Sequence, residues 1–273
     1  MQDSSAWTPP DGTLGAIVRE AQHRARRLHE RAAELGRAAD AARCAPGFGA
    51  ALACSSVGVI AEIKRRSPSK GWIQPSIDAG AQAVAYQAGG AAAISVLTEP
   101  VHFGGSTEDL TDVRARVGVP VLKKDFHIDP IQLVEAKAIG ASAVLLIVRA
   151  LSPASLQRMA DAGHSLGLEL LIEVRDDEEL ARALDVGADV IGINNRNLET
   201  LVIEPGTAER MLGLIPSSVV AVAESGVASR SDVERFARHG ADAVLVGSVV
   251  SAAADPAGAV RALAGVERVA REH

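Results

Sequence analysis

Short runs of β-branched and other aliphatic residues recur along the chain after residue 56, separated by longer segments rich in alanine and charge. Eight such runs are found, at 57–63, 92–97, 119–122, 142–148, 168–174, 189–193, 219–223 and 242–246. Most are nearly continuous in Val, Ile and Leu, which is typical of parallel strands covered on both faces. Segments between them, such as 131–139 and 177–184, carry apolar residues at helical spacing. The pattern therefore predicts alternating strands and helices.

Glycine closes several of the predicted helices just before the next strand, at Gly90, Gly140, Gly187 and Gly240. Glycine there supplies the left-handed residue that ends a helix and turns the chain back. Eight such units fit a closed (β/α)8 TIM barrel, whose usual size is about 250 residues. A doubly wound open sheet is the alternative, but it usually carries a glycine-rich nucleotide fingerprint after its first strand. Neither G-x-G-x-x-G nor a P-loop occurs here, which favours the barrel.

The chain before the first predicted strand has a different pattern. Leu14, Ala21, Leu28 and Leu35 recur every seven residues. A coiled coil would sustain this repeat for longer, so a helix packed on the barrel is expected. We therefore predict an N-terminal helical extension over residues 1–56 and a catalytic (β/α)8 barrel over 57–273.

Composition narrows the classes of function. The chain has 273 residues, 48% of them hydrophobic, and a net charge of −6 without long blocks of like charge, so a nucleic-acid partner is not expected. No apolar run approaches the roughly 18 residues of a membrane span, and residues 1–12 lack a signal-peptide pattern, which excludes a membrane partner. Cys44 and Cys54 form no C-x-x-C pair. We expect no disulfide, no metal and a cytoplasmic location.

Polar residues end several of the predicted strands. Ile60, Glu62 and Lys64 share one parity, so if Ile60 points into the barrel, both charges lie at its mouth, where barrel active sites are found. Lys123 and Lys124, at the end of the third strand, have opposite parity, so only one of them can point inward.

Further strands supply carboxylates and amides at the same face. Glu173 ends the fifth strand, Asn194 and then Arg196 follow the sixth, and Glu224 with Ser225 ends the seventh. A single such carboxylate could be a structural partner of a helix or an arginine, but five polar strand ends favour a site. An ammonium about 4–6 Å from a carboxylate tunes the pKa of both groups, as general acid–base catalysis requires.

Lysine is scarce. Only five lysines are present, so 23 of the 28 basic residues are arginines, and four of the five lysines fall in two short segments, 64–70 and 123–124. A codon bias toward arginine is one explanation. The functional explanation is that these places need an ammonium whose pKa can be lowered, which a guanidinium cannot provide.

Two loops suggest a phosphate site, because Gly226 follows the seventh strand and Gly247 with Ser248 follows the eighth. Barrels frequently bind phosphate there through backbone N–H groups, although tight turns would give the same pattern. Phe103 and Phe126 lie just past strand ends, which indicates either an aromatic substrate moiety or core packing. The histidines lack metal-ligand spacing, and we interpret His127 as a loop residue.

Seven segments together resemble the indole-3-glycerol phosphate synthase family. They are AEIKRRSPSKG, SVLTEPVHFGGS, PVLKKDF, LLIEV, IGINNRNLETL, VAESGV and VLVGS, which occur in order between residues 57 and 250. The resemblance implies a (β/α)8 barrel with an extra N-terminal segment. It also implies the ring closure of 1-(o-carboxyphenylamino)-1-deoxyribulose 5-phosphate to indole-3-glycerol phosphate, carbon dioxide and water, in tryptophan biosynthesis and without a cofactor.

The resemblance also implies roles for individual residues. Lys124 is the general acid, which selects it over Lys123, and Glu173 is the general base. Lys64 holds the anionic substrate and shares in proton donation. The other implied site residues are Glu62 and Asn194, which orient these groups; Arg196, Glu224 and Ser225, which complete the pocket; and Ser67, Gly226, Gly247 and Ser248, which bind carboxylate and phosphate.

Two alternatives differ in activity. A barrel resembling phosphoribosylanthranilate isomerase would need a Cys and Asp pair, and Cys44 and Cys54 precede the first strand or lie at its edge. A barrel that binds a phosphorylated metabolite without turnover would not need the Lys and Glu set. We expect a phosphorylated small-molecule substrate, a monomer or weak homo-oligomer, and closure of a loop near Gly71 and 104–105 over the substrate.

Overall fold

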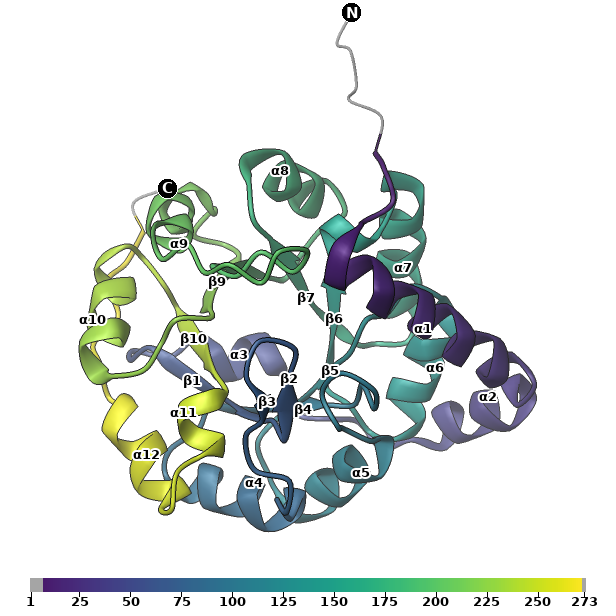
Figure 1. Ribbon diagram of the computed structural model, residues 1–273, viewed down its shortest axis with the longest axis horizontal. Coiled ribbons are helices and arrows are strands. Elements are labelled where there is room, and N and C mark those ends of the chain that lie inside the picture. The colour runs from purple at the N-terminus through teal and green to yellow at the C-terminus, as the bar shows by residue number, and fades with distance from the viewer. Residues whose placement is uncertain (1–6, 272–273) are drawn as a thin grey trace, which may run out of the picture.

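Eight parallel strands close into a barrel in the computed structural model, which describes residues 7–271 (Figure 1). The order around the barrel is β1-β10-β9-β8-β7-β6-β5-β4. These strands are β1 (Gly58–Ile63), β4 (Ala93–Leu97), β5 (Val121–Lys124), β6 (Ala143–Ile147), β7 (Glu169–Val174), β8 (Val190–Asn194), β9 (Val220–Glu224) and β10 (Ala243–Val246). Each of the eight apolar runs forms one barrel strand, so the predicted TIM barrel is confirmed.

The loop after β1 contains a small antiparallel hairpin that the sequence did not predict. Its strands are β2 (Arg66–Ser67) and β3 (Gly71–Trp72), with Gly71 in the left-handed region at φ 66°. The glycine allows the tight reversal that pairs the two strands. Ser67, at the end of β2, therefore lies at the start of an ordered turn in the loop that follows β1.

Helices form a ring outside the strands (Figure 1). They are α4 (Ala79–Ala88), α5 (Thr107–Arg116), α6 (Pro130–Ala138), α7 (Pro153–Ser165), α8 (Asp177–Asp185), α9 (Gly206–Met211), α10 (Arg230–Arg238), α11 (Ser248–Ser251) and α12 (Pro256–Leu263), with 3₁₀ turns η1 (Val148–Ala150) and η2 (Leu212–Leu214). Most begin at an Asp or Ser whose side chain accepts a hydrogen bond from the first turn; Asp129 and Ser229 form complete capping boxes before α6 and α10. Such caps satisfy N–H groups that have no partner within the helix.

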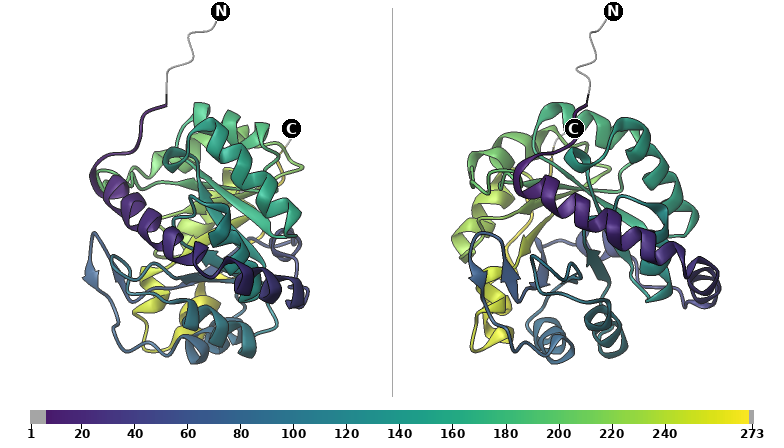
Figure 2. Two further views of the ribbon diagram at one scale, coloured as in Figure 1. Left: turned by 90° about the vertical axis from the view of Figure 1, so that its right-hand side faces the viewer. Right: turned by 45° about the vertical axis from the view of Figure 1, so that its right-hand side comes forward.

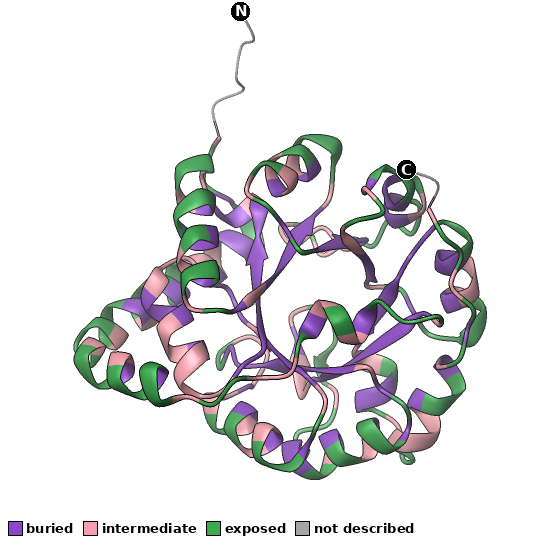
Figure 3. Ribbon diagram, turned by 180° about the vertical axis from the view of Figure 1, so that it is seen from behind, coloured by how far each residue is buried: buried purple, intermediate pink, exposed green. Residues whose placement is uncertain are grey.

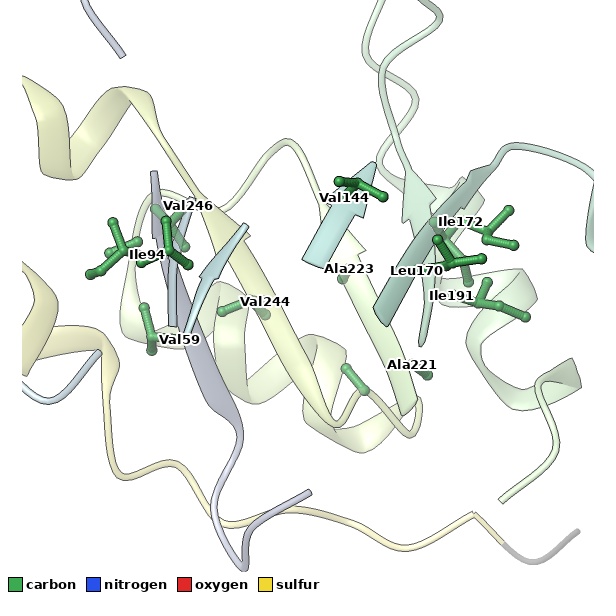
Figure 4. Close-up of a cluster of buried hydrophobic side chains, with 14 of the residues drawn as sticks. Val59, Ile94, Val144, Leu170, Ile172, Ile191, Ala221, Ala223, Val244 and Val246 are labelled. Atoms are coloured by element: carbon green, nitrogen blue, oxygen red, sulfur yellow. The ribbon is translucent and has the colours of Figure 1, made fainter. Parts of the chain in front are cut away.

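Alternate residues of each strand belong to two separate apolar layers. One set faces the surrounding helices; Figure 4 shows Leu170, Ile172 and Ile191 of this layer together beside β7 and β8. The other set, including Ile60 and Leu171, fills the barrel interior. Figure 3 shows the barrel strands mostly buried, while the outer helices carry many exposed positions. This alternation fixes which strand-end residues reach the mouth.

From residue 7 onward, three helices precede β1: α1 (Gly12–His29), α2 (Ala32–Ala41) and α3 (Phe48–Leu52). Figure 2 shows α1 running along one side of the barrel, where it packs against α6 and η1. At the opposite end, the backbone N–H groups of Phe48 and Gly49 donate to the Glu169 carboxylate at 2.5 and 2.7 Å. The N-terminal segment therefore contacts both ends of the barrel through more than one helix.

Residues 1–6, part of the N-terminal stretch in which we found no signal-peptide pattern, lie outside the described residues. Between residues 7 and 271, no helix is long and apolar enough to cross a membrane.

Candidate active site

A pocket of about 230 Å³ lies at the carboxyl ends of the barrel strands. Its walls come from the loops after most of the strands and from the start of α1, which contributes Thr13 and Ile17. All the residues that the sequence predicted for the site line it: Glu62, Lys64, Ser67, Phe103, Lys124, Phe126, Glu173, Asn194, Arg196, Glu224, Ser225, Gly226, Gly247 and Ser248. Both cysteines are exposed and lie outside this pocket.

Two lysines and two carboxylates form a connected network at the bottom of the pocket. Glu62 is fully buried; its Oε1 pairs with Lys64 Nζ, and its Oε2 lies 3.7 Å from Lys124 Nζ. Lys124 Nζ also lies 3.6 Å from Oε2 of Glu224. Lys124 therefore faces the pocket. Lys123 faces outward, where its Nζ binds Glu135 of α6 at 2.8 Å.

The carboxylates around Lys124 raise its pKa instead of lowering it. Burial opposes the charged ammonium, but Glu62, Glu224 and Glu173 outweigh this effect, and the pKa of Lys124 lies above its ordinary value. The expectation of a lowered ammonium pKa is therefore wrong for Lys124, because several negative groups meet at one cation. Lys124 therefore remains protonated at neutral pH.

The pKa values of the two carboxyl groups in the network are shifted in opposite directions. Burial disfavours the charge of Glu62, but Lys64 and Lys124 outweigh it and lower the pKa of Glu62. Burial raises the pKa of Glu224 to about 8, against the opposing effect of Lys124. When neighbouring carboxyl groups cannot all be ionised, one commonly has a lowered pKa and stays ionised while another has a raised pKa and keeps its proton. At neutral pH, Glu62 is the anion that pairs with the lysines, and Glu224 holds a proton.

Two glycines make room for these carboxylates. A Cβ at Gly192 of β8 would lie 2.1 Å from Oε1 of Glu224, and one at Gly247 would lie 2.5 Å from Oε1 of Glu62. Real Cβ atoms do not approach side-chain oxygens so closely. The chain must therefore have glycine at both positions for the buried carboxylates to keep their places.

Glu173, Asn194 and Arg196 form the wall across from the hairpin loop. Glu173 is buried and lines the pocket from the end of β7. Asn194 Oδ1 accepts a hydrogen bond from the Arg196 N–H at 2.9 Å, and Arg196 Nη1 donates to the Leu201 carbonyl at 2.8 Å. These bonds fix the chain after β8, so that the Arg196 side chain stays at the rim.

The backbone after β9 turns sharply at the pocket wall. Ser225 and Gly226 both have positive φ, at 64° and 89°. Asn195, which the sequence analysis did not select, holds this turn: its Nδ2 donates to the Ser225 carbonyl at 2.9 Å, and its Oδ1 accepts from the Ala208 N–H at 2.9 Å. Non-glycine residues at positive φ are costly and persist only where the surroundings impose them.

Phe103 and Phe126 lie together on one side of the pocket. Their ring centroids are 6.0 Å apart and tilted by 32°. The buried carboxylate of Glu99 accepts from the Phe103 N–H at 3.0 Å and so fixes the loop that carries this ring. The rings give the pocket an apolar wall beside its charged floor.

A buried ion pair ties α1 to the segment that follows Lys124. Both terminal nitrogens of Arg24 donate to the Asp125 carboxylate, at 2.8 and 2.7 Å, and Thr98 Oγ1 donates to it at 2.7 Å. Burial disfavours the charge of Asp125, but Arg24 and Lys123 outweigh it and hold its pKa well below the usual range. Sequence analysis missed this pair, whose only signal was the acidic residue after the two lysines.

His127 follows this segment and is a loop residue, as the sequence analysis interpreted it. Its ring is buried, and Nδ1 is 2.8 Å from the Leu145 carbonyl. Burial, reinforced by Lys123, lowers the pKa of His127 to about 3. Among residues 7–271, no group of three or more His, Cys, Asp or Glu side chains is arranged to hold a metal ion.

A closed (β/α)8 barrel with lysines and carboxylates gathered at the carboxyl ends of its strands defines a barrel enzyme. Residues 14–263 match the family model for indole-3-glycerol phosphate synthase. The chain is 53% identical over 209 residues to the indole-3-glycerol phosphate synthase of Nocardioides sp., covering 77% of this chain and 80% of that protein. It is 51% identical over 227 residues to indole-3-glycerol phosphate synthase 1 of Streptomyces coelicolor, covering 83% and 84%. The chain belongs to the indole-3-glycerol phosphate synthase family and is a carboxy-lyase.

Solved structures of other barrels share the fold. 3-Hexulose-6-phosphate synthase from Salmonella typhimurium matches with a TM-score of 0.60 at 18% identity, covering 76% of this chain and 96% of that one. Thiamine phosphate pyrophosphorylase from Pyrococcus furiosus matches with a TM-score of 0.58 at 18% identity, covering 76% and 93%. At this identity the likeness concerns the fold alone.

Proposed function

We propose that the protein closes the indole ring of 1-(o-carboxyphenylamino)-1-deoxyribulose 5-phosphate, with loss of carbon dioxide and water. The observation that carries the proposal is the convergence of Lys124, Glu62 and Glu224 at one point, with Glu173 in the same pocket. Together these groups supply a charged acid and a carboxylate base on one small substrate. Membership of the family makes this substrate the natural candidate.

Lys124 acts as the general acid of ring closure. Its ammonium donates a proton to the ketone oxygen while the ring carbon that bears the carboxylate attacks the carbonyl carbon. Carbon dioxide then leaves from that ring carbon, and the electron pair it leaves behind restores the aromatic ring. The raised pKa of Lys124 supports this role, because the group is protonated when substrate arrives. Such proton donation contributes about 10²–10⁴ in rate.

Glu173 acts as the general base of dehydration. The hydroxyl made in the first step leaves as water with a second proton from the lysine pair, and Glu173 removes a proton from the five-membered ring to complete the indole. Two protons are donated and one is removed, so each turnover takes up one proton from solvent. Glu173 is buried at the pocket wall, so its carboxylate lies within the pocket that would hold the substrate.

The anionic ends of the substrate require local attraction, since the protein has a net charge of −6. Lys64 and Ser67 fit the carboxylate. The loops after β9 and β10, with Gly226, Gly247 and Ser248, fit the phosphate, and Ser248 begins a helix whose first N–H groups lack helical partners. Phe103 and Phe126 provide the apolar wall for the aromatic ring. A phosphorylated small molecule is therefore the ligand that suits the site.

The test is turnover of the carboxyphenylamino deoxyribulose phosphate, followed by the fluorescence of the indole product. The wild-type protein should produce indole-3-glycerol phosphate, and Glu173→Gln should lower kcat by at least about 10²-fold. Lys137→Met, which removes a lysine of α6 outside the pocket, is the control and should leave kcat unchanged. Absence of product with wild-type protein, or full activity of Glu173→Gln, would contradict the proposal.

A further inference from the structure

A second cavity, of about 210 Å³, lies beside the active-site pocket, between the ends of β6, β7 and β8. Glu173 lines both cavities, together with Ile147 and Leu198. The proposed general base is therefore part of the wall that separates them. The second cavity reaches the surface, because Asp176 on its rim is exposed.

The carboxylate of Glu173 acts electrostatically on Lys124 in the first pocket and also lines this second cavity. Across residues 7–271, no donor makes a hydrogen bond to its oxygens, although the side chain is only 3% exposed. The cavity is polar and wide enough for several water molecules. A water chain can therefore connect the Glu173 carboxylate to the exposed rim.

Glu179, near the start of α8, lines the same cavity. Its Oε2 accepts a hydrogen bond from the Arg175 N–H at 2.8 Å. Burial, with added repulsion from Asp176 and Glu173, raises the pKa of Glu179 to about 7. A carboxyl with this pKa can accept and release a proton near neutral pH.

Other charged groups surround Glu179. Arg182 of its own helix acts against the raised pKa. Arg149 of η1 and Glu199 of the loop after β8 form an ion pair at 2.8 Å at the wall of the cavity. Their opposite charges therefore largely offset each other's effect on Glu179. The charged residues lining the cavity are Arg149, Glu173, Arg175, Asp176, Glu179 and Glu199.

We propose that this cavity is the proton exit of Glu173, and that Glu179 carries the proton from it to bulk water. The inference rests on the proposed function, in which substrate and product fill the first pocket while Glu173 holds the proton removed from the ring. The proton passes from the Glu173 carboxyl to cavity water, then to the Glu179 carboxylate, and then to solvent at the rim. Glu173 returns to its ionised form, and no electrons are transferred.

The test compares kcat of Glu179→Gln with that of wild type in steady-state turnover from pH 6 to 9, at low buffer concentration, because each new cycle requires Glu173 to lose its proton first. Glutamine keeps an oxygen that can accept the Arg175 N–H but cannot take up or release a proton near neutral pH. We expect kcat to fall by about tenfold, with KM unchanged. Added imidazole should restore the rate in proportion to its concentration, while wild type should not respond, since it has its own carrier.

Two controls separate a proton carrier from a structural residue. Glu178→Gln changes the exposed neighbour on the same helix and should behave as wild type, and Glu179→Asp should retain part of the rate because it still titrates. An unchanged rate in Glu179→Gln, or a loss that imidazole does not repair, would overturn the inference. Failure of wild type to turn over the substrate would instead refute the proposed function.

Discussion

Lys124 Nζ lies 3.6 Å from Oε2 of Glu224, although the two residues end strands on opposite sides of the barrel. In the strand order, three strands separate β5 from β9 in either direction. Only barrel closure brings these two ends together, so the contact depends on the whole fold. Because Glu224 is buried with a pKa raised to about 8, this contact also has a pH dependence.

The first prediction concerns that pH dependence. A carboxyl whose pKa is raised on folding stabilises the native state below its unfolded pKa, and this contribution is lost as pH rises through the folded value of about 8. Glu224→Gln, which resembles the protonated acid, should therefore gain stability relative to wild type between pH 5 and pH 8.5, by an amount on the order of a few kcal/mol. Urea unfolding at both pH values measures it. A constant difference between the two proteins would show that Glu224 is ionised in both states.

The second prediction concerns the ion pair between α1 and the segment after Lys124. Arg24→Met leaves the buried Asp125 without its cation, which should cost about 3–5 kcal/mol in the free energy of unfolding at pH 7. Arg27→Met, at an exposed position on the same helix, should change it by less than about 0.5 kcal/mol.

The stabilisation that Arg24 provides through Asp125 should depend on pH in a defined direction. The pKa of Asp125 is lowered in the folded protein, so the stabilisation is present above the ordinary aspartate pKa and is lost as pH falls through the folded value. The difference between Arg24→Met and wild type should therefore shrink in acid. Equal stability of the two proteins at pH 7 would be inconsistent with a buried pair.

The third prediction concerns the glycine beneath Glu224. A Cβ at residue 192 would lie 2.1 Å from its carboxylate, so Gly192→Ala should displace Glu224, lower the unfolding free energy by about 1–3 kcal/mol and reduce kcat. Gly213→Ala provides the comparison, because a Cβ there meets no atom within 4 Å. If activity and stability of Gly192→Ala match those of the Gly213→Ala protein, the close approach is not a constraint.

Much of the architecture could be predicted from the sequence because its signals are local. Each barrel strand is a continuous aliphatic run, and the parity of Ile60, Glu62 and Lys64 follows from the pleat alone. Membership of the family was likewise readable from short motifs at strand ends. The sequence did not predict the short helix α3, because it is held by Glu169, which is distant in sequence. It also did not predict the hairpin of β2 and β3, because this depends on a turn of few residues.

The electrostatics of the site could not be predicted in the same way. The direction of the Lys124 pKa depends on how many carboxylates converge on it, and Glu62, Glu173 and Glu224 come from three separate strands. Arg24 and Asp125 are 101 residues apart, so no spacing in the sequence connects them. Asn195 is adjacent to the predicted site residue Asn194, but its structural role becomes visible only in the hydrogen bond that it donates to the Ser225 carbonyl.

The central claim is that Lys124, and not its neighbour Lys123, is the acid of ring closure. Single-turnover rates of indole formation with Lys124→Met and Lys123→Met measure this most directly, because the two substitutions are chemically identical and adjacent in the chain. We predict that Lys124→Met loses at least about 10²-fold in rate. Lys123→Met, whose ammonium binds Glu135 outside the pocket, should keep a rate near wild type in the folded protein even if its stability falls. Comparable rates in Lys124→Met and wild type would contradict the account.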